Sequence, residues 1–318
     1  MQRCLLYIFL LFIAVPTAPA QELFIHNNPA SVLPRDAIAV RTISGLYKED
    51  GYLRFRQGLR VGFGILSAWQ MAVEVSFSNH NHPGLISELF GDGTVDHSHH
   101  NHGSGEGDIN EEHLHPFQLN GITLSSQYRF FTSDGPNRHL RAATYQVLST
   151  NFTTHNFAEP NLQHRTAGAT VGLIGTWLRN KFAASLRLGG IYSLASHEKE
   201  TGRAFKPGNA LEYALSLGYL AFPTRYKSYQ QLNINFYAEF MGRWFRRGLA
   251  RDTDGIWYYI ENSPETDPGR YLEFRPGLQF ILNSRMRADF STALPFLGRS
   301  YTMDYPQFQL NLQYLFFR

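Results

Sequence analysis

The feature that most constrains this chain is a period of two in its apolar residues, with little competing helical periodicity after residue 35. Segment 70–77 is the clearest example, because every odd position is apolar and every even position is polar or small. Segments 232–241 and 307–316 repeat the alternation. Period-two alternation indicates strands with two different faces. The chain is therefore expected to fold mainly as β-structure.

Segments with this pattern recur along the whole sequence, and most have the 9–11 residues, or slightly more, that a tilted transmembrane strand needs. The expected strands are 36–47, 52–66, 70–78, 117–131, 139–150, 166–178, 182–195, 210–222, 232–245, 271–282, 285–297 and 307–317. Aromatic residues near several strand ends are typical of the girdles that flank a membrane. These residues are Trp69, Tyr128, Phe130, Phe131, Trp177, Tyr219, Trp244 and Phe245.

The connections between these segments alternate in length. Those after the even-numbered strands are short, at 67–69, 132–138, 179–181, 223–231 and 283–284. Those after the odd-numbered strands are longer, at 79–116, 151–165, 196–209, 246–270 and 298–306, with 48–51 as the exception. A soluble sandwich has no reason for this alternation, whereas outer-membrane barrels have short periplasmic turns and long outer loops. We expect an all-β fold, a transmembrane antiparallel up-and-down β-barrel of about 12 strands formed by residues 21–318.

Residues 1–20 have the layout of a cleavable secretory signal peptide: Arg3, an apolar run over 4–15, and the small residues Ala18-Pro19-Ala20. The single cysteine, Cys4, lies in this segment, which excludes a disulfide framework and a Cys-ligated zinc site. A net charge of +3 does not indicate a nucleic-acid partner. The expected location is the outer membrane of a Gram-negative bacterium, with outer-membrane lipid around the barrel.

A glycine-spaced strand, a tight turn and a return strand opened by an aromatic residue follow one another in GLRVGFGILSAWQMAVEV, at 58–75. This signature resembles the family of predicted outer-membrane barrels named after the meta-pathway of phenol degradation. The stretches LSLGYLAFPTRYKSYQQLNINFYAEFMGRW and RPGLQFILNSRMRADFSTALP resemble the second half of that family. The resemblance implies a transporter-like barrel, distantly similar to the long-chain fatty-acid transporters. The ending YLFF before Arg318 resembles the insertion signal of bacterial outer-membrane barrels.

The expected outer loop 79–116 is rich in histidine. It holds His80, His82, His97, His99, His100, His102, His113 and His115. Neutral imidazole is a strong ligand for zinc, copper and nickel, and nearby carboxylates can complete the coordination shell. We expect no required cofactor, and hypothesise that the loop binds Zn, Cu or Ni loosely. A loop whose charge follows pH, and a loop with no such role, stay open.

Eight charged residues fall on the polar side of the expected strands: Glu74, Arg187, Glu212, Glu239, Arg275, Arg285, Arg287 and Asp289. An Arg or Lys that faces lipid at mid-depth costs about 2–4 kcal/mol, so these side chains are expected to face the lumen. They either line a water-filled pore or pair with one another in a narrow barrel.

These features favour a channel or transporter for small solutes, linked to divalent-metal capture or export by the histidine-rich loop. Uptake of small hydrophobic or aromatic compounds, and a structural or adhesin-like barrel, stay open. An outer-membrane lipase or protease is least favoured, because the sequence has no G-x-S-x-G motif. The run Asp96-His97-Ser98-His99 is not in itself a catalytic triad. The sequence makes no prediction of oligomeric state.

Overall fold

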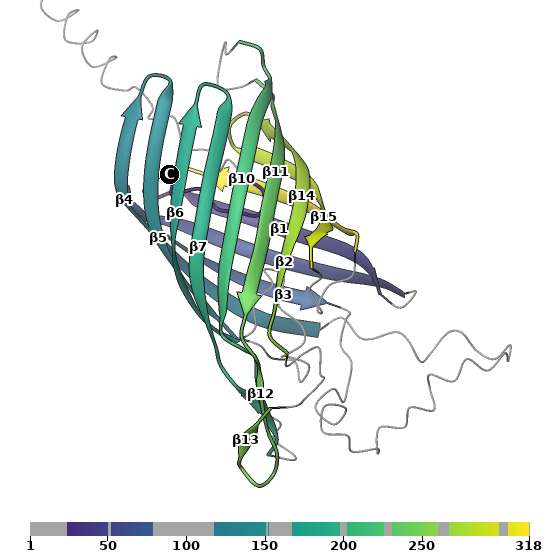
Figure 1. The fold of residues 1–318 in the computed structure, drawn as a ribbon. Helices are drawn as coiled ribbons and strands as arrows, with labels where there is room; N and C mark the ends of the chain where they lie inside the picture. The colour runs from purple at the N-terminus through teal and green to yellow at the C-terminus, as the bar shows by residue number, and fades with distance from the viewer. Residues whose placement is uncertain are drawn as a thin grey trace, which may run out of the picture.

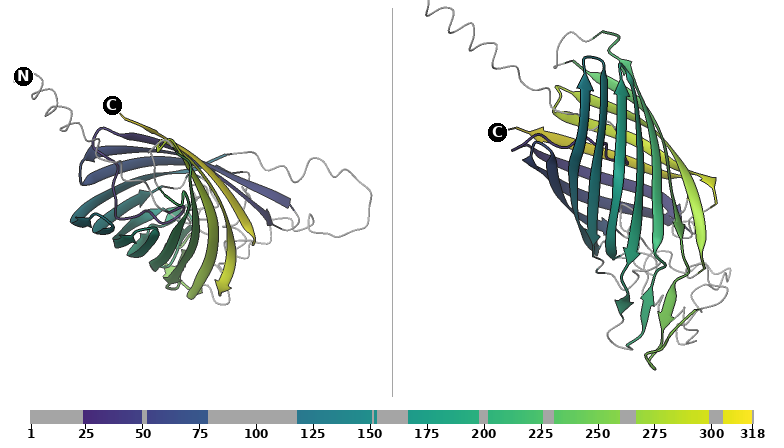
Figure 2. Two further views of the ribbon diagram at one scale, coloured as in Figure 1. Left: turned by 90° about the horizontal axis from the view of Figure 1, so that it is seen from above. Right: turned by 60° about the vertical axis from the view of Figure 1, so that its left-hand side comes forward.

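The computed structural model describes residues 24–49, 52–78, 118–150, 152, 167–197, 202–225, 231–259, 267–298 and 305–317. Twelve long antiparallel strands form one closed barrel in which β1 pairs with β16 (Figures 1 and 2). These strands are β1 Ile38–Glu49, β2 Tyr52–Leu66, β3 Trp69–Ser78, β4 Gln118–Gly135, β5 Arg138–Ser149, β6 Gly168–Arg179, β7 Phe182–Ser193, β10 Ala210–Phe222, β11 Asn233–Phe245, β14 Gly269–Leu282, β15 Met286–Leu297 and β16 Gln307–Phe316. The expected all-β, twelve-strand barrel is confirmed. Within the described residues, no α-helix is long and apolar enough to cross a membrane.

The two ends of the barrel differ as the connection lengths predict. At one end, called here the short-turn end, strands are joined by turns such as 180–181 and 283–285. Asn180, Asn283 and Ser284 take positive φ angles of 54°, 51° and 54° in these turns. Asparagine tolerates this left-handed conformation better than most residues, which makes it suited to tight turns. The opposite, long-loop end holds the longer connections.

Two of the long connections, which the alternation predicts to be loops, carry a small sheet. It consists of β8 Ser196–His197, β9 Ala204–Lys206, β12 Leu249–Arg251 and β13 Trp257–Tyr258, in the order β13-β12-β9-β8. Figure 1 shows β12 and β13 beyond the long-loop end of the wall. Asp252 accepts a hydrogen bond from the Thr253 backbone N–H and pairs with Arg203, and both interactions lower the pKa of its carboxyl group. Strands of two or three residues are too short for a period of two to be recognised in the sequence.

The wall has an apolar outer face and a polar inner face. On β3 the buried positions Gln70, Ala72, Glu74, Ser76 and Ser78 alternate with more exposed apolar ones. Aromatic side chains are exposed on the outer face near the short-turn end, among them Tyr128, Phe130, Phe131, Trp177 and Tyr219. An apolar exterior with aromatic residues near its rim is the arrangement of a barrel surrounded by lipid.

The residues before β1 lie inside the barrel, which the sequence analysis did not predict. We call residues 24–37 the N-terminal segment. Phe24 and Ile25 pack with Ala183 and Tyr237, whereas Leu33 and Ala37 pack with Ala39 and Leu315. The segment therefore spans the lumen between opposite sides of the wall, in the half nearer the short-turn end.

Glycines on the inner face make room for this segment. A Cβ atom on Gly64 would collide with the Pro34 carbonyl group, and one on Gly277 would collide with the Ile25 side chain. A Cβ atom on Gly62 would lie 3.1 Å from Leu33 Cδ1. The glycine spacing of β2 is thus explained by close approach of another part of the chain.

Candidate functional site in the barrel lumen

Glu239 of β11 holds the N-terminal segment by its backbone. Its two carboxylate oxygens each accept a hydrogen bond of 3.0 Å, Oε2 from the His26 N–H and Oε1 from the Asn27 N–H. Ser216 Oγ donates to Oε1 at 2.9 Å. Glu239 is fully buried, so these three donors supply the stabilisation that water would otherwise give a buried carboxylate.

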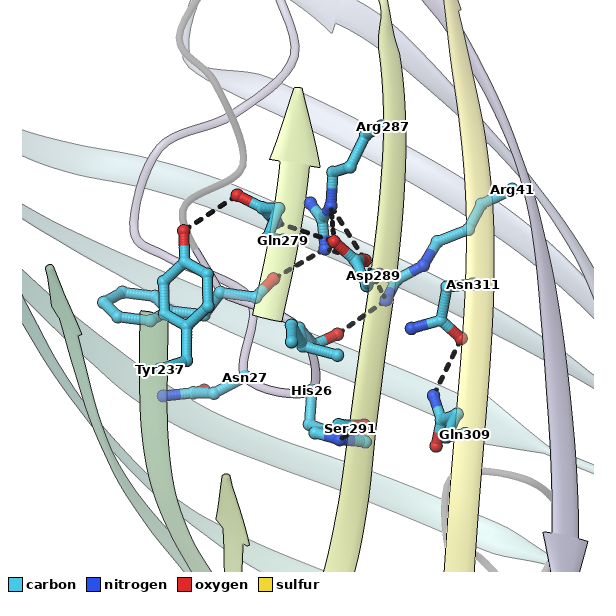
Figure 3. A network of polar contacts seen from close by, with 12 residues as sticks. His26, Asn27, Arg41, Tyr237, Gln279, Arg287, Asp289, Ser291, Gln309 and Asn311 are labelled. Atoms are coloured by element: carbon cyan, nitrogen blue, oxygen red, sulfur yellow. Dashed lines mark hydrogen bonds and ion pairs between the residues drawn. The ribbon is translucent and has the colours of Figure 1, made fainter. Parts of the chain in front are cut away.

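A second network centres on Asp289 of β15 (Figure 3). Arg287 Nη2 lies 2.7 Å from Asp289 Oδ2, Arg41 Nη2 lies 3.4 Å from the same oxygen, and Gln279 Nε2 donates to Oδ1 at 2.8 Å. The two arginines also reach the N-terminal segment. Arg287 donates to the Phe24 carbonyl at 2.8 Å and Arg41 to the Ile25 carbonyl at 2.6 Å. One carboxylate therefore positions two cations that bind the segment's backbone.

His26 connects the segment to a third network. Its Nδ1 lies 3.2 Å from Arg275 Nη1, and its Nε2 lies 2.9 Å from Ser291 Oγ. A guanidinium group can only donate, so Nδ1 acts as the acceptor and the imidazole is neutral in this arrangement. Arg275 also pairs with Glu273 at 2.6 Å, and Tyr305 donates to the same carboxylate at 2.5 Å.

At the other end of the segment, neutral side chains bind the backbone, and Arg141 Nη1 donates to the Ser31 side chain at 2.9 Å. Gln127 donates to the carbonyl oxygens of Pro29 and Ser31 at 2.7 and 3.1 Å. The Ala30 N–H donates to Thr176 Oγ1 at 2.8 Å, and the Leu33 N–H donates to Gln70 Oε1 at 2.7 Å. The inner wall thus supplies the hydrogen bonds that the segment, without regular secondary structure, would otherwise lack.

On the long-loop side of the segment lies a cavity of about 90 Å³, called here the arginine cavity. It is bounded by His26 and Asn28 of the segment and by inward side chains of β1, β2, β7, β10, β11, β14 and β16. Arg187 Nη2 pairs with Glu212 Oε1 there at 2.6 Å, and Tyr145 donates to the same oxygen at 2.5 Å. The Arg187 guanidinium also lies over the Tyr145 ring, 4.8 Å from its centroid.

Seven of the eight charged residues assigned to the lumen from the sequence lie on the inner face: Glu74, Arg187, Glu212, Glu239, Arg275, Arg287 and Asp289. Arg285 does not. It is exposed in the turn between β14 and β15, and its guanidinium lies 5.7 Å from the centroid of the Phe317 ring. The reason is that its N–H donates to the Leu282 carbonyl at 3.1 Å, which makes Arg285 part of the turn rather than the first residue of a strand.

Several lumen charges were missed by the sequence prediction: Arg41, Arg54, Arg56, Arg60, Arg243 and Glu273. The period of two in the sequence contains the information needed to assign these residues to the lumen. Glu273 is two residues from Arg275, and Arg54, Arg56 and Arg60 are an even number of residues apart, so the period of two places each set on one face.

The histidine-rich loop lies outside the described residues, so His80, His82, His97, His99, His100, His102, His113 and His115 stay a sequence-based metal prediction. In the part of the chain that the structure does describe, no three histidine, cysteine or acidic side chains come together as a metal site.

No protein-family model matches the chain, and no curated protein matches it in sequence. Among solved structures, it is similar to the COG4313 outer membrane channel of Pseudomonas putida F1, with 11% identity over 92% of this chain and 100% of that chain and a TM-score of 0.56. The NanC porin aligns with 88% of this chain and 99% of its own at 8% identity and a TM-score of 0.47. Outer membrane phospholipase A of Escherichia coli aligns with 95% and 98% at 9% identity and a TM-score of 0.40. The likeness to the COG4313 channel shows that the chain has the fold of an outer-membrane β-barrel, whereas the specific resemblance to the phenol-degradation family stays a prediction.

Proposed function

We propose that the chain is an outer-membrane channel for small solutes, and that its own N-terminal segment closes the passage. The observation that carries this proposal is a closed barrel with an apolar outside and a charged inside, crossed by a segment that does not belong to the wall. Lipid suits the outer face, and the polar inner face suits water and polar solutes. The location in the outer membrane, reached by means of the signal peptide, belongs to the same proposal.

The N-terminal segment is suited to act as a removable closure. It joins the wall at β1, and its other contacts with the wall are non-covalent, including those to Glu239, Arg287 and Gln127. A segment attached in this way can leave the lumen while the ladder of wall strands stays intact. Release would connect the arginine cavity to the short-turn end.

The other functions receive less support. Metal capture at residues 80–115 rests on composition, and it can accompany a channel without altering the lumen. Uptake of hydrophobic compounds requires a continuous apolar path, whereas the described lumen has buried arginine, glutamate, serine and amide side chains among its tyrosines and aliphatic residues. We propose no enzymatic activity, since the described inner-face residues bind the N-terminal segment and border the arginine cavity.

Conductance in planar bilayers tests the proposal. We compare the wild-type chain with Glu239→Gln, which keeps the shape of the side chain but removes the charge that binds two backbone N–H groups. Hydrogen bonds to charged groups contribute about 1.5–3 kcal/mol, so the open population of the variant should rise about tenfold or more. Asp267→Asn, in an exposed pair with Arg247, is the matched control and should behave as wild type. Absence of conductance in both wild type and Glu239→Gln contradicts a channel, and equal steady conductance in both contradicts closure by the segment.

A further inference from the structure

The charges that line the arginine cavity do not balance. Five arginines border it, namely Arg41, Arg60, Arg187, Arg243 and Arg275, against two acidic residues, Glu212 and Glu273. Each glutamate is already engaged by one of these arginines, Glu212 by Arg187 and Glu273 by Arg275, both at 2.6 Å. Both carboxylates also accept a tyrosine hydroxyl. Arg41 pairs with Asp289, which it shares with Arg287. The five arginines of the cavity still exceed the three carboxylates that pair with them, so the cavity keeps an excess of positive charge.

Arg60 of β2 is central to this excess. Among the residues that the structure describes, it forms no hydrogen bond or ion pair, and it borders the arginine cavity and two smaller neighbouring cavities. Its cross-strand neighbours are Arg41 on β1 and Glu74 on β3. Glu74 reduces the local charge, but the five arginines of the cavity still outnumber the four carboxylates near them, which are Glu74, Glu212, Glu273 and Asp289. A partly buried guanidinium facing a cavity favours an anion there, because its donors are strongest toward a negatively charged acceptor.

Further arginines extend this charge toward the long-loop end. Arg54 and Arg56 are buried on the same inner face of β2 as Arg60. With a rise of about 3.3 Å per residue, they lie roughly 20 and 13 Å from Arg60 along the strand. A polar passage lined by one sign of charge concentrates the opposite ion. Both arginines have partners of their own, Arg56 donating to Tyr47 Oη at 3.1 Å, so the row adds positive potential on the way to Arg60 rather than free donors.

We infer that the arginine cavity binds a small anion through Arg60, and that the barrel passes anions in preference to cations. The fork of a guanidinium fits a carboxylate, and a cavity of about 90 Å³ has room for a small carboxylate such as acetate. The binding site stands on the cavity itself, whereas the selectivity of passage rests on the proposed channel function.

Binding is tested without any need for conduction, by the line width of the chloride-35 NMR signal in the presence of the detergent-solubilised full chain. Chloride held at a site relaxes faster than free chloride, and sodium acetate is added as competitor. We compare wild type with Arg60→Gln and with Arg138→Gln, an exposed arginine at the first residue of β5. The expected result is acetate-sensitive broadening in wild type and Arg138→Gln that falls about fivefold in Arg60→Gln, as expected for loss of one nearby charge. Equal broadening in all three overturns the site.

Selectivity is tested by the reversal potential under a potassium chloride gradient, in the Glu239→Gln background that favours the open channel. Chloride should be favoured over potassium, and adding Arg60→Gln should lower the permeability ratio about fivefold. A cation preference, or a ratio that Arg60→Gln leaves unchanged, overturns anion selectivity. Loss of all conductance together with intact chloride binding contradicts the channel and supports the anion site.

Discussion

The N-terminal segment divides the lumen into two halves that use arginine differently. On the short-turn side, Arg287 is matched by Asp289 and donates to the Phe24 carbonyl. On the long-loop side, Arg60 borders a cavity and has no partner among the described residues. Where acids and backbone carbonyls match the guanidinium groups, arginine holds the N-terminal segment in place. Where arginines outnumber the acids, the same side chain offers a site to a ligand.

The largest expected effect on the free energy of unfolding comes from removing the carboxylate of Asp289, on the short-turn side of the lumen. Asp289→Asn leaves Arg41 and Arg287 buried without their carboxylate, which should lower the free energy of unfolding by about 3–5 kcal/mol. The exposed pair of Asp267 and Arg247 is the comparison, and Asp267→Asn should cost about 0–1 kcal/mol. Denaturant unfolding in lipid vesicles measures both. Equal losses would show that burial of the Asp289 network does not matter.

A smaller effect should follow from crowding the segment without changing any charge. Gly64→Ala adds a methyl group where the Pro34 carbonyl already lies, and overpacking of this kind costs about 1–3 kcal/mol. Gly175→Ala is the control, since a Cβ there meets nothing within 4 Å. Amide hydrogen exchange at Ala30 and Leu33 should become faster in Gly64→Ala alone. Unchanged exchange would mean that the segment does not pack against β2.

The histidine-rich loop offers a further contrast, because metal cations and an arginine-lined lumen are electrostatically opposed. Deletion of residues 80–115 should abolish zinc binding in calorimetric titrations, whereas Arg60→Gln should leave that binding unchanged. Binding should also weaken as the pH falls below about 6.5, because protons compete for the imidazole ligands. Equal zinc binding with and without the loop contradicts metal capture by these histidines.

The smallest effect on stability is expected for a residue outside the lumen. Arg285→Gln alters an exposed turn residue and should change the free energy of unfolding by less than about 0.5 kcal/mol. The reversal potential of the channel should also be unchanged. A shift in selectivity would place Arg285 in the conducting path, where the alternation of the sequence predicts it.

The wall could be predicted from the sequence because alternation and loop length are local signals. They located all twelve wall strands to within a few residues and placed Glu74, Glu212 and Glu239 inside. The N-terminal segment could not be predicted in this way, since it has no regular secondary structure. Its partner Glu239 lies 213 residues from His26. Glycines such as Gly64 and Gly277 on the inner face were the one indirect sign that another part of the chain passes close by.

Closure of the barrel by the N-terminal segment can be tested most directly with a reversible tether. Ala30 of the segment and Ala143 of β5 pack in one buried cluster, and the only natural cysteine is Cys4. In the Glu239→Gln background, Ala30→Cys with Ala143→Cys should conduct when reduced and fall silent when a disulfide forms, with Ala30→Cys alone as control. Conductance that persists in the cross-linked protein would show that the passage does not run through the space occupied by the segment.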